Sequence, residues 1–248
     1  MKRFRCVIVG GSGALGSTIC RRLYKDGAHI GWTYHSGEVI AANLRGELPD
    51  SVGLRVDLRD TTQVEQTIAA FAQQLGGIDA LIHCAAICLT PGDEIPPDQT
   101  QKLPHVHRAG WDELMAINVS SVYFACREAV PHMQAAGGGN IVLVGSVSGT
   151  RPLPSPIHYA TSRTALEGMA RAMSKEVGPD NIRVNVIEPG ILEAGVSRSL
   201  PGTLREEYEK HCALKRVGTM SEIANVVAWF AQHNTYVTGQ NILVDGAL

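Results

Sequence analysis

The 248-residue sequence predicts an α/β fold in which residues 1–248 form a single domain, a doubly wound sheet of about seven parallel strands with helices on both faces. Seven short apolar runs rich in β-branched residues recur along the chain, and several are apolar throughout, as in strands covered on both faces. Longer segments with helical spacing separate these runs. Strand–helix–strand alternation of this kind builds right-handed βαβ units in one sheet. No repeat or linker divides the chain.

The elements follow one another in a regular order. The expected strands are residues 6–9, 29–34, 52–58, 80–84, 141–144, 183–187 and 242–244. The expected helices are one that includes Ile19 and Leu23, and residues 61–75, 111–135, 159–177 and 221–231. Residues 194–214 mix basic and acidic side chains, which is typical of a solvated helical lid. Residues 88–108 hold four prolines and show no periodicity, which predicts a long loop of the kind that is often functional or mobile.

The composition argues against several classes of protein. The formal net charge is −2, whereas nucleic-acid-binding domains usually carry a concentrated basic surplus, so no nucleic-acid partner is expected. No window of 18 consecutive apolar residues exists, so no membrane partner or membrane span is expected. Six dispersed cysteines without a C-x-x-C pair are typical of reduced thiols, which predicts a cytoplasmic protein.

A glycine-rich turn follows the first expected strand and precedes an amphipathic helix. It reads Gly10-Gly11-Ser12-Gly13-Ala14-Leu15-Gly16. Glycine allows positive φ and a close approach to a pyrophosphate, and a helix N-terminus offers free N–H groups to phosphate. The alternative is an ordinary strand–helix turn, but the strand before it and the helix after it favour a dinucleotide site of the Rossmann type. We expect Gly10, Ser12, Gly13, Leu15 and Gly16 to bind the coenzyme.

The end of the second strand bears on the choice of coenzyme. An acidic side chain there would bind the ribose 2′-hydroxyl of NAD and repel the 2′-phosphate of NADP. No carboxylate occurs between Ile30 and Glu38, and the end of the strand carries Tyr34, His35 and Ser36. We expect these three residues to contact the coenzyme. They favour NADPH, and NAD stays an alternative because no Arg or Lys lies in this stretch.

A serine, a tyrosine and an arginine form a candidate catalytic group. Ser146 follows the buried strand 141–144, and ligands bind beyond the carboxyl ends of strands in open α/β sheets. Tyr159 comes 13 residues later (159 − 146), and Arg163 shares its helix face. A fixed cation nearby lowers the pKa of a tyrosine, which suits proton transfer to a carbonyl oxygen during hydride transfer. Tyr and Arg alone are more often a surface pair, but the glycine turn and Ser146 together favour catalysis.

Together these motifs resemble the short-chain dehydrogenase/reductase family over nearly the whole chain, and especially its 3-oxoacyl-carrier-protein reductases. The resemblance implies an oxidoreductase in which Ser146, Tyr159 and Arg163 are catalytic and Asn118 holds a proton-relay water. It also implies that Asp57, followed by Leu58, contacts adenine. The other coenzyme contacts that it implies are Cys84, Ala85, Ala86, Tyr159, Arg163, Pro189, Gly190 and Leu192.

Several residues depart from the family pattern. Arg163 stands in place of a lysine, and a guanidinium can bind ribose and act on the tyrosine but does not readily release a proton. His83-Cys84-Ala85-Ala86 replaces Asn-Asn-Ala-Gly, and Ala194 replaces a threonine that often binds the carboxamide. These departures leave an alternative open, a weak or inactive nucleotide-binding homologue that serves as a regulatory or assembly partner of an active reductase.

The expected activity is NADPH-dependent reduction of a ketone, in particular a 3-oxoacyl thioester on a small molecule or a carrier protein. We expect residues 88–108 and 194–214 to form the substrate pocket. Members of the family associate through their long helices, which implies a homo-oligomer, a dimer or a tetramer. His105 and His107, with His83 nearby, could suggest a metal, but two histidines at i and i+2 in a proline-rich loop lack the geometry and the third ligand of a zinc site, so no metal is expected.

Overall fold

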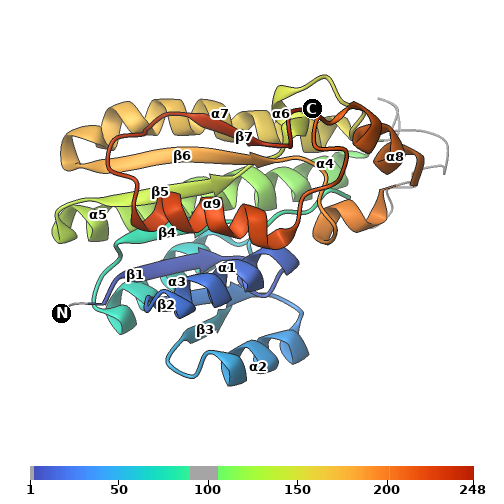
Figure 1. Ribbon diagram of the computed structural model, residues 1–248. Helices are drawn as coiled ribbons and strands as arrows, with labels where there is room; N and C mark the ends of the chain where they lie inside the picture. Colours follow the sequence, from blue (N-terminus) through green and yellow to red (C-terminus); the bar gives the residue numbers. More distant parts are fainter. Residues whose placement is uncertain (1–2, 90–105, 201) are drawn as a thin grey trace.

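Seven parallel strands form one sheet in the order β3-β2-β1-β4-β5-β6-β7 (Figure 1). The computed structural model describes residues 3–89, 106–200 and 202–248. The strands are β1 (Arg5–Val9), β2 (His29–Tyr34), β3 (Val52–Arg55), β4 (Ala80–His83), β5 (Gly139–Val144), β6 (Ile182–Pro189) and β7 (Asn241–Val244). The predicted sheet is therefore confirmed, although β3 ends at Arg55, three residues earlier than expected.

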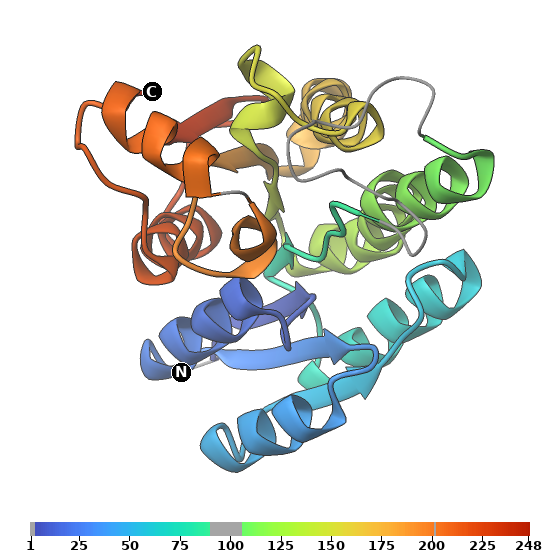
Figure 2. The same ribbon diagram turned by 90° about the vertical axis from the view of Figure 1, so that its right-hand side faces the viewer.

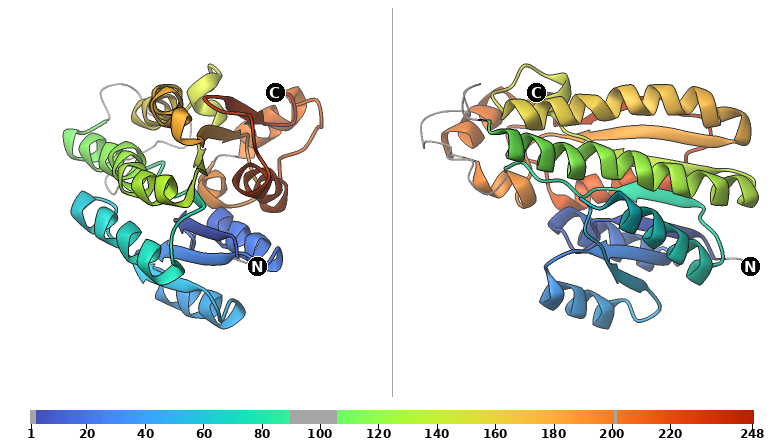
Figure 3. Two further views of the ribbon diagram at one scale, coloured as in Figure 1. Left: turned by 90° about the vertical axis from the view of Figure 1, so that its left-hand side faces the viewer. Right: turned by 180° about the vertical axis from the view of Figure 1, so that it is seen from behind.

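Helices cover both faces of the sheet. The α-helices are α1 (Ala14–Lys25), α2 (Glu38–Glu47), α3 (Thr61–Leu75), α4 (Arg108–Met115), α5 (Ser121–Ala136), α6 (Val147–Thr150), α7 (Ile157–Val177), α8 (Gly202–His211) and α9 (Met220–Gln232). Helices α3, α5 and α7 pack on one face around a core that includes Phe71, Met133 and Leu166, as the rear view in Figure 3 shows. Helices α1, α2 and α9 pack on the other face around Leu23, Leu44 and Val227.

Helix boundaries follow local chemistry. The side chain of Asp60 accepts hydrogen bonds from two backbone N–H groups and begins α3, and Gly76 ends it in the left-handed conformation. Thr219 and Glu222 form a capping box at the start of α9. The single helix expected over residues 111–135 is instead α4 and α5 joined by η2 (Ala116–Ser120), a π-helical turn. Such turns are frequent at functional sites.

The order of the strands places a crevice at one end of the sheet. Chain connections run outward in opposite directions from β1 and β4, and Val9 and His83 lie side by side in the last register position of this pair. Ligands of open α/β sheets bind at such a reversal, beyond the carboxyl ends of the strands. Figure 2 turns this end toward the viewer, with α6 and α8 above the glycine turn.

Two further findings concern the described part of the chain. None of its helices is long and apolar enough to cross a membrane. All six cysteines lie in this part, and none of them forms a disulfide. Of the predicted loop 88–108, residues 90–105 lie outside the described residues, and so does His105. The predicted lid 194–214 contains a 3-10 helix, η4 (Gly195–Ser199), followed by α8.

Candidate active site

A cavity of about 910 Å³ lies at the carboxyl ends of the strands. Its lining comes from the glycine turn, the ends of β2 to β6, the start of α7, and the segment of η4 and α8. Nearly all the residues expected to bind coenzyme or to act in catalysis line it: Gly10, Ser12, Gly13, Leu15, Gly16, Tyr34, His35, Asp57, Leu58, Cys84, Ala85, Ala86, Ser146, Tyr159, Arg163, Pro189, Gly190 and Leu192. Ser36 and Asn118 are not among the lining residues.

The glycine turn leaves room for a phosphate. Gly10 has φ +90°, and a Cβ there would lie 2.7 Å from the backbone nitrogen of Ala85. Only glycine therefore fits where the segment after β1 passes the segment after β4. Gly13 is the N-cap of α1 and provides no side-chain cap, so the first N–H groups of the helix face the cavity without a competing side chain. Thr33 fixes the turn from β2, because its Oγ1 accepts a hydrogen bond from Gly10 N at 2.8 Å.

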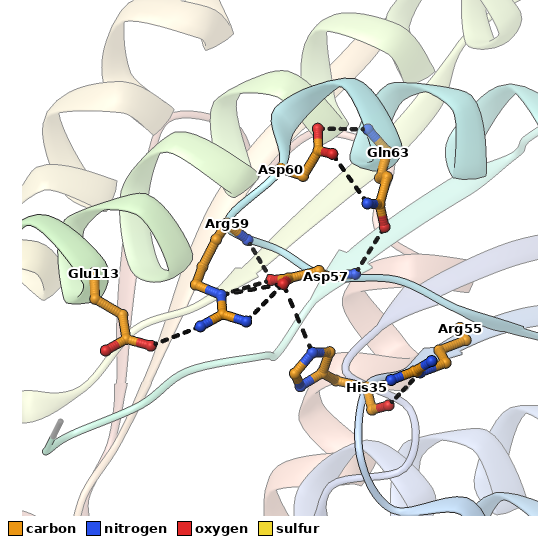
Figure 4. A network of polar contacts seen from close by, with 7 residues as sticks. All are labelled: His35, Arg55, Asp57, Arg59, Asp60, Gln63 and Glu113. Atoms are coloured by element: carbon orange, nitrogen blue, oxygen red, sulfur yellow. Dashed lines mark hydrogen bonds and ion pairs between the residues drawn. The ribbon is translucent and has the colours of Figure 1, made fainter. Parts of the chain in front are cut away.

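Charged residues gather where β2 and β3 end (Figure 4). Arg59 donates to both carboxylate oxygens of Asp57, from Nη2 at 2.7 Å and from Nε at 2.9 and 3.1 Å. This pairing with Arg59 lowers the pKa of Asp57 to about 2. His35 Nε2 lies 3.8 Å from the same carboxylate, and Arg55 Nε donates to the backbone oxygen of His35. The sequence argument missed both arginines, because Arg55 ends β3 and Arg59 follows it, and both come near the end of β2 only through the sheet pairing.

The exit of β4 is packed tightly against the turn. Ala85 lies under Gly10, and the Cys84 thiol donates to Val9 O at 3.2 Å. Burial raises the pKa of Cys84 to about 12, so it stays a thiol. His83 is buried and its Nε2 lies 3.1 Å from Ser121 Oγ. Because Ser121 gives its own hydrogen to Ile117 O, the ring nitrogen Nε2 of His83 carries a hydrogen.

Arg163 projects from α7 into the sheet end and is only 2% exposed. Its Nη1 donates to Val144 O at 3.1 Å, and its Cζ lies 5.3 Å from the ring centroid of Tyr159. Its Nη2 is buried and has no hydrogen-bond partner among the described residues. An unsatisfied buried donor is costly, so this nitrogen suits a hydroxyl acceptor that enters the cavity.

The pKa of Tyr159 differs from the sequence-based prediction. Burial of the side chain raises the pKa above its ordinary value, and this effect outweighs the lowering by Arg163 and by a hydrogen bond with Ser146. The predicted effect of the arginine is therefore present, but the prediction of a net lowering is wrong for the chain by itself. The sequence could not give this balance, because it depends on how completely the ring is enclosed.

Asn118 lies in the π-helical turn η2 and is fully buried. Its Oδ1 accepts from Ile87 N at 3.0 Å, and its Nδ2 donates to Ile87 O at 2.8 Å and to Ser162 Oγ at 3.1 Å. These contacts occupy its side-chain amide and tie the segment after β4 to α7. The side chain of Asn118 therefore fixes Ile87 at the cavity wall, and the water-holding role that the family resemblance implies stays a prediction.

The other half of the cavity is apolar. Its walls come from the segment between α6 and α7 and from the segment of η4 and α8, with Leu153, Pro154, Val196, Leu200 and Leu204. Polar side chains on this side include Tyr208, Glu207 and His211, and His211 Nε2 lies 3.3 Å from Glu207 Oε2. Among residues 3–89, 106–200 and 202–248, no three His, Cys, Asp or Glu side chains are grouped to hold a metal ion.

The cavity fits a nicotinamide dinucleotide. The glycine turn offers a phosphate cradle, the end of β2 offers a place for the adenosine ribose, and Arg163 Nη2 offers an unused donor beside Tyr159. A polar end and an apolar end meet at Ser146 and Tyr159. The arrangement can therefore bring a coenzyme and a substrate carbonyl together at the tyrosine hydroxyl.

Comparisons with known proteins agree with this geometry. Residues 11–248 match the family model described as enoyl-(acyl carrier protein) reductase. The 3-oxoacyl-[acyl-carrier-protein] reductase FabG of Chlamydia muridarum is 30% identical over 247 residues, which cover 98% of this chain and 96% of that protein.

Solved structures are similar over almost the whole chain. A blue fluorescent protein from a metagenomic library, in complex with NADPH, has a TM-score of 0.85 at 30% identity, covering 98% of this chain and 97% of that one. The NADH-dependent reductase A1-R′, responsible for alginate metabolism, has a TM-score of 0.84 at 26% identity, with 99% and 96% covered. By its sheet, its glycine turn and these similarities, the chain belongs to the short-chain dehydrogenase/reductase family of NAD(P)-dependent oxidoreductases.

Proposed function

We propose that this chain is an NADPH-dependent reductase that converts the ketone of a 3-oxoacyl thioester to the alcohol. The observation that carries the proposal is the buried guanidinium of Arg163, which lies against the Tyr159 ring and has one nitrogen without a partner among the described residues. A buried unpaired donor beside a buried phenol has no evident structural use, whereas a sugar hydroxyl and a carbonyl would satisfy both. The alternative of a protein that only binds nucleotide gains no support from this arrangement.

Each residue then has a defined part. The nicotinamide coenzyme supplies a hydride when it is bound. Arg163 Nη2 donates to the nicotinamide ribose, and the Arg163 charge stabilises a developing phenolate on Tyr159. Tyr159 gives its proton to the carbonyl oxygen of the substrate, and Ser146 donates a hydrogen bond to the same oxygen. Asn118 holds the cavity wall through Ile87.

The charges at the end of β2 support NADPH over NADH. Asp57 is the nearest described carboxylate to His35, and Arg59 neutralises it through a two-pronged contact. Arg55 adds a further cation next to the His35 backbone. A 2′-phosphate entering here would meet Arg55, Arg59, His35 and Ser36, and the two nearby carboxylates, Asp57 and Glu113, are both paired with Arg59. The structure similar to this chain that holds NADPH is consistent with this choice. The similar NADH-dependent reductase shows that a preference for NADH is the competing possibility.

The apolar half of the cavity supports an acyl substrate. Leu153, Pro154, Val196, Leu200 and Leu204 offer a wall for a hydrocarbon chain, and burial of each methylene contributes about 0.8 kcal/mol. The similarity to a 3-oxoacyl-carrier-protein reductase favours a thioester whose ketone lies at the 3-position.

Two further properties are proposed together with this activity. The chain forms a homo-oligomer through α5 and α7, and its six cysteines remain thiols in a reducing cytoplasm.

The test follows coenzyme oxidation with a series of 3-oxoacyl thioesters, using NADPH and NADH in parallel. Tyr159→Phe should lower kcat by a factor of 100 or more, because the ring packing is kept and the proton is lost. Coenzyme affinity, measured by fluorescence titration, should change by less than threefold. An unchanged kcat in Tyr159→Phe would contradict the role of Tyr159. Coenzyme binding without turnover of any ketone would overturn the reductase proposal, and higher kcat/KM with NADH would overturn the coenzyme choice.

A further inference from the structure

Two glutamate carboxyl groups meet behind the segment that carries Ser146. Glu188 lies near the end of β6 and is fully buried, and Glu167 lies in α7 and is 8% exposed. Thr150, the last residue of α6, donates to Glu188 Oε2, and its hydroxyl lies 3.3 Å from Glu167 Oε1. Neither carboxyl group is among the residues that line the active-site cavity.

Counting hydrogens shows that this arrangement needs an extra proton. A threonine hydroxyl has one hydrogen, so it can donate to only one of the two carboxylates at a time. Glu188 Oε1 is buried and has no hydrogen-bond partner among the described residues. Two ionised carboxylates in contact repel each other, and a buried negative charge without donors is costly. Burial, together with the nearby Glu167, raises the pKa of Glu188 to about 6.

The charges around the two glutamates do not replace the extra proton. Arg171, also in α7, lies 3.5 Å from Glu167 Oε2, but its side chain is 59% exposed and screened by solvent. Arg151, which follows α6, lies 3.8 Å from Asp245, a residue just beyond β7. The charged groups that act on Glu188 are therefore Glu167 and Arg171, both from α7, while Arg151 is paired with Asp245.

The pair is connected to Ser146 on two sides. Ser146 is the N-cap of α6, and Thr150 is the last residue of the same four-residue helix. A Cβ on Gly145, the residue before Ser146, would lie 3.1 Å from Glu188 Cγ, so the glutamate side chain packs directly on this backbone. The other side of α6 rests on α7, where Thr164 Oγ1 donates to Gly149 O at 2.8 Å.

We propose that the Glu167–Glu188 pair is a proton-dependent positioning device for Ser146. When the pair shares a proton, Thr150 holds α6 against β6 and α7, and Ser146 stays at Tyr159. When that proton is lost, the two negative charges repel, the Thr150 contact weakens, and α6 shifts with its serine. Glu167 and Glu188 act through α6 and touch neither substrate nor coenzyme. The catalytic consequence rests on the proposed reductase function, because only then does Ser146 bind a carbonyl oxygen.

The kinetic test compares pH profiles of kcat from pH 5 to 8.5. In the unmodified chain kcat should fall about threefold to tenfold as the pair ionises. Glu188→Gln keeps the size of the side chain, adds a donor toward Glu167 and cannot ionise, so this fall should disappear. Glu167→Gln should have the same effect and serves as a second variant if the first folds poorly. Glu176→Gln, an exposed change in the same helix, is the matched control and should keep the original profile.

A second readout does not depend on catalysis. Hydrogen exchange of the amides of residues 147–150, corrected for the intrinsic pH dependence, should accelerate above pH 6 in the unmodified chain and not in Glu188→Gln. Identical exchange in the two proteins at every pH would overturn the proposal. If no protein reduces any ketone, the reductase proposal fails, while the exchange measurement still decides whether the carboxyl pair positions α6.

Discussion

Arg163 shows how one side chain serves several partners at once. Its Nη1 donates to Val144 O, its Nε lies 3.4 Å from Ser162 Oγ, and its Nη2 has no partner in the part of the chain that the structure describes. Burial lowers its pKa from the ordinary value, and Tyr159 opposes this lowering, but a guanidinium remains charged at every pH that a protein survives. A lysine has a single nitrogen, so it cannot keep both of these contacts and still present a third nitrogen to a ligand.

Arg163→Lys should therefore lower kcat/KM about tenfold, although lysine is the residue that the family pattern has here. The loss corresponds to about 1.4 kcal/mol of transition-state stabilisation, close to one hydrogen bond from a charged group. Steady-state kinetics with NADPH and a 3-oxoacyl thioester measures it, and Arg163→Met, which removes the charge, should lose more than the lysine variant. A severalfold rise in turnover with lysine would mean that the arginine is a handicap and not an adaptation.

Sequence reasoning reached most of the candidate site because its residues follow strands directly. The glycine turn, Ser146, Tyr159 and Arg163 each occur at a spacing that the chain itself displays. Arg59 and the His83–Ser121 contact were missed, because they depend on neighbours brought together by the sheet and by η2. The direction of the Tyr159 pKa shift could not be predicted from the sequence either, because burial raises the pKa and the charge of Arg163 lowers it.

At the scale of elements, α6 and α7 form the contact that sets the distance between Ser146 and Tyr159. Gly149 lies where the two helices touch, and a Cβ there would be 2.9 Å from Thr164 N and 3.0 Å from Arg163 Cβ. The long helices were predictable from apolar spacing. The short α6 and the π-helical turn η2 were not, because four or five residues carry no periodic signal.

Gly149→Ala should lower both the free energy of unfolding and catalysis. The added methyl group meets backbone atoms of α7, which cannot move aside as a flexible side chain can, so we expect a loss of about 1 to 3 kcal/mol in stability. The displaced Ser146 should lower kcat at least tenfold. Urea unfolding and steady-state kinetics measure the two effects. Gly168→Ala is the matched control, because a Cβ at that exposed position of α7 meets nothing within 4 Å and should be neutral or slightly stabilising.

At the scale of the whole molecule, the sheet buries several ionisable groups whose pKa values depart from the ordinary range in opposite directions. Burial, followed by the charge of Arg163, lowers the pKa of His83 to about 3. Burial raises the pKa of Glu188 to about 6. The contribution of His83 to stability is lost as the pH falls from 6.5 toward 3, and the contribution of Glu188 is lost as the pH rises from 4.5 to 6, so the two oppose each other and largely cancel between pH 4.5 and 6.

His83 gives the sharpest test of this balance. Between pH 6.5 and pH 3 the unfolded chain binds a proton at His83 and the folded chain does not, so stability falls as the pH falls. Between pH 7 and pH 5 this single residue should cost about 2 kcal/mol of unfolding free energy. His83→Asn removes the titrating ring, so urea unfolding of this variant should lose about 2 kcal/mol less than the unmodified chain over the same interval. His233→Asn, a change at an exposed histidine, is the control and should follow the unmodified chain. Equal losses in the unmodified chain and in His83→Asn would show that the imidazole is protonated in the folded protein, and that the charge of Arg163 does not exclude a second positive charge from this end of the sheet.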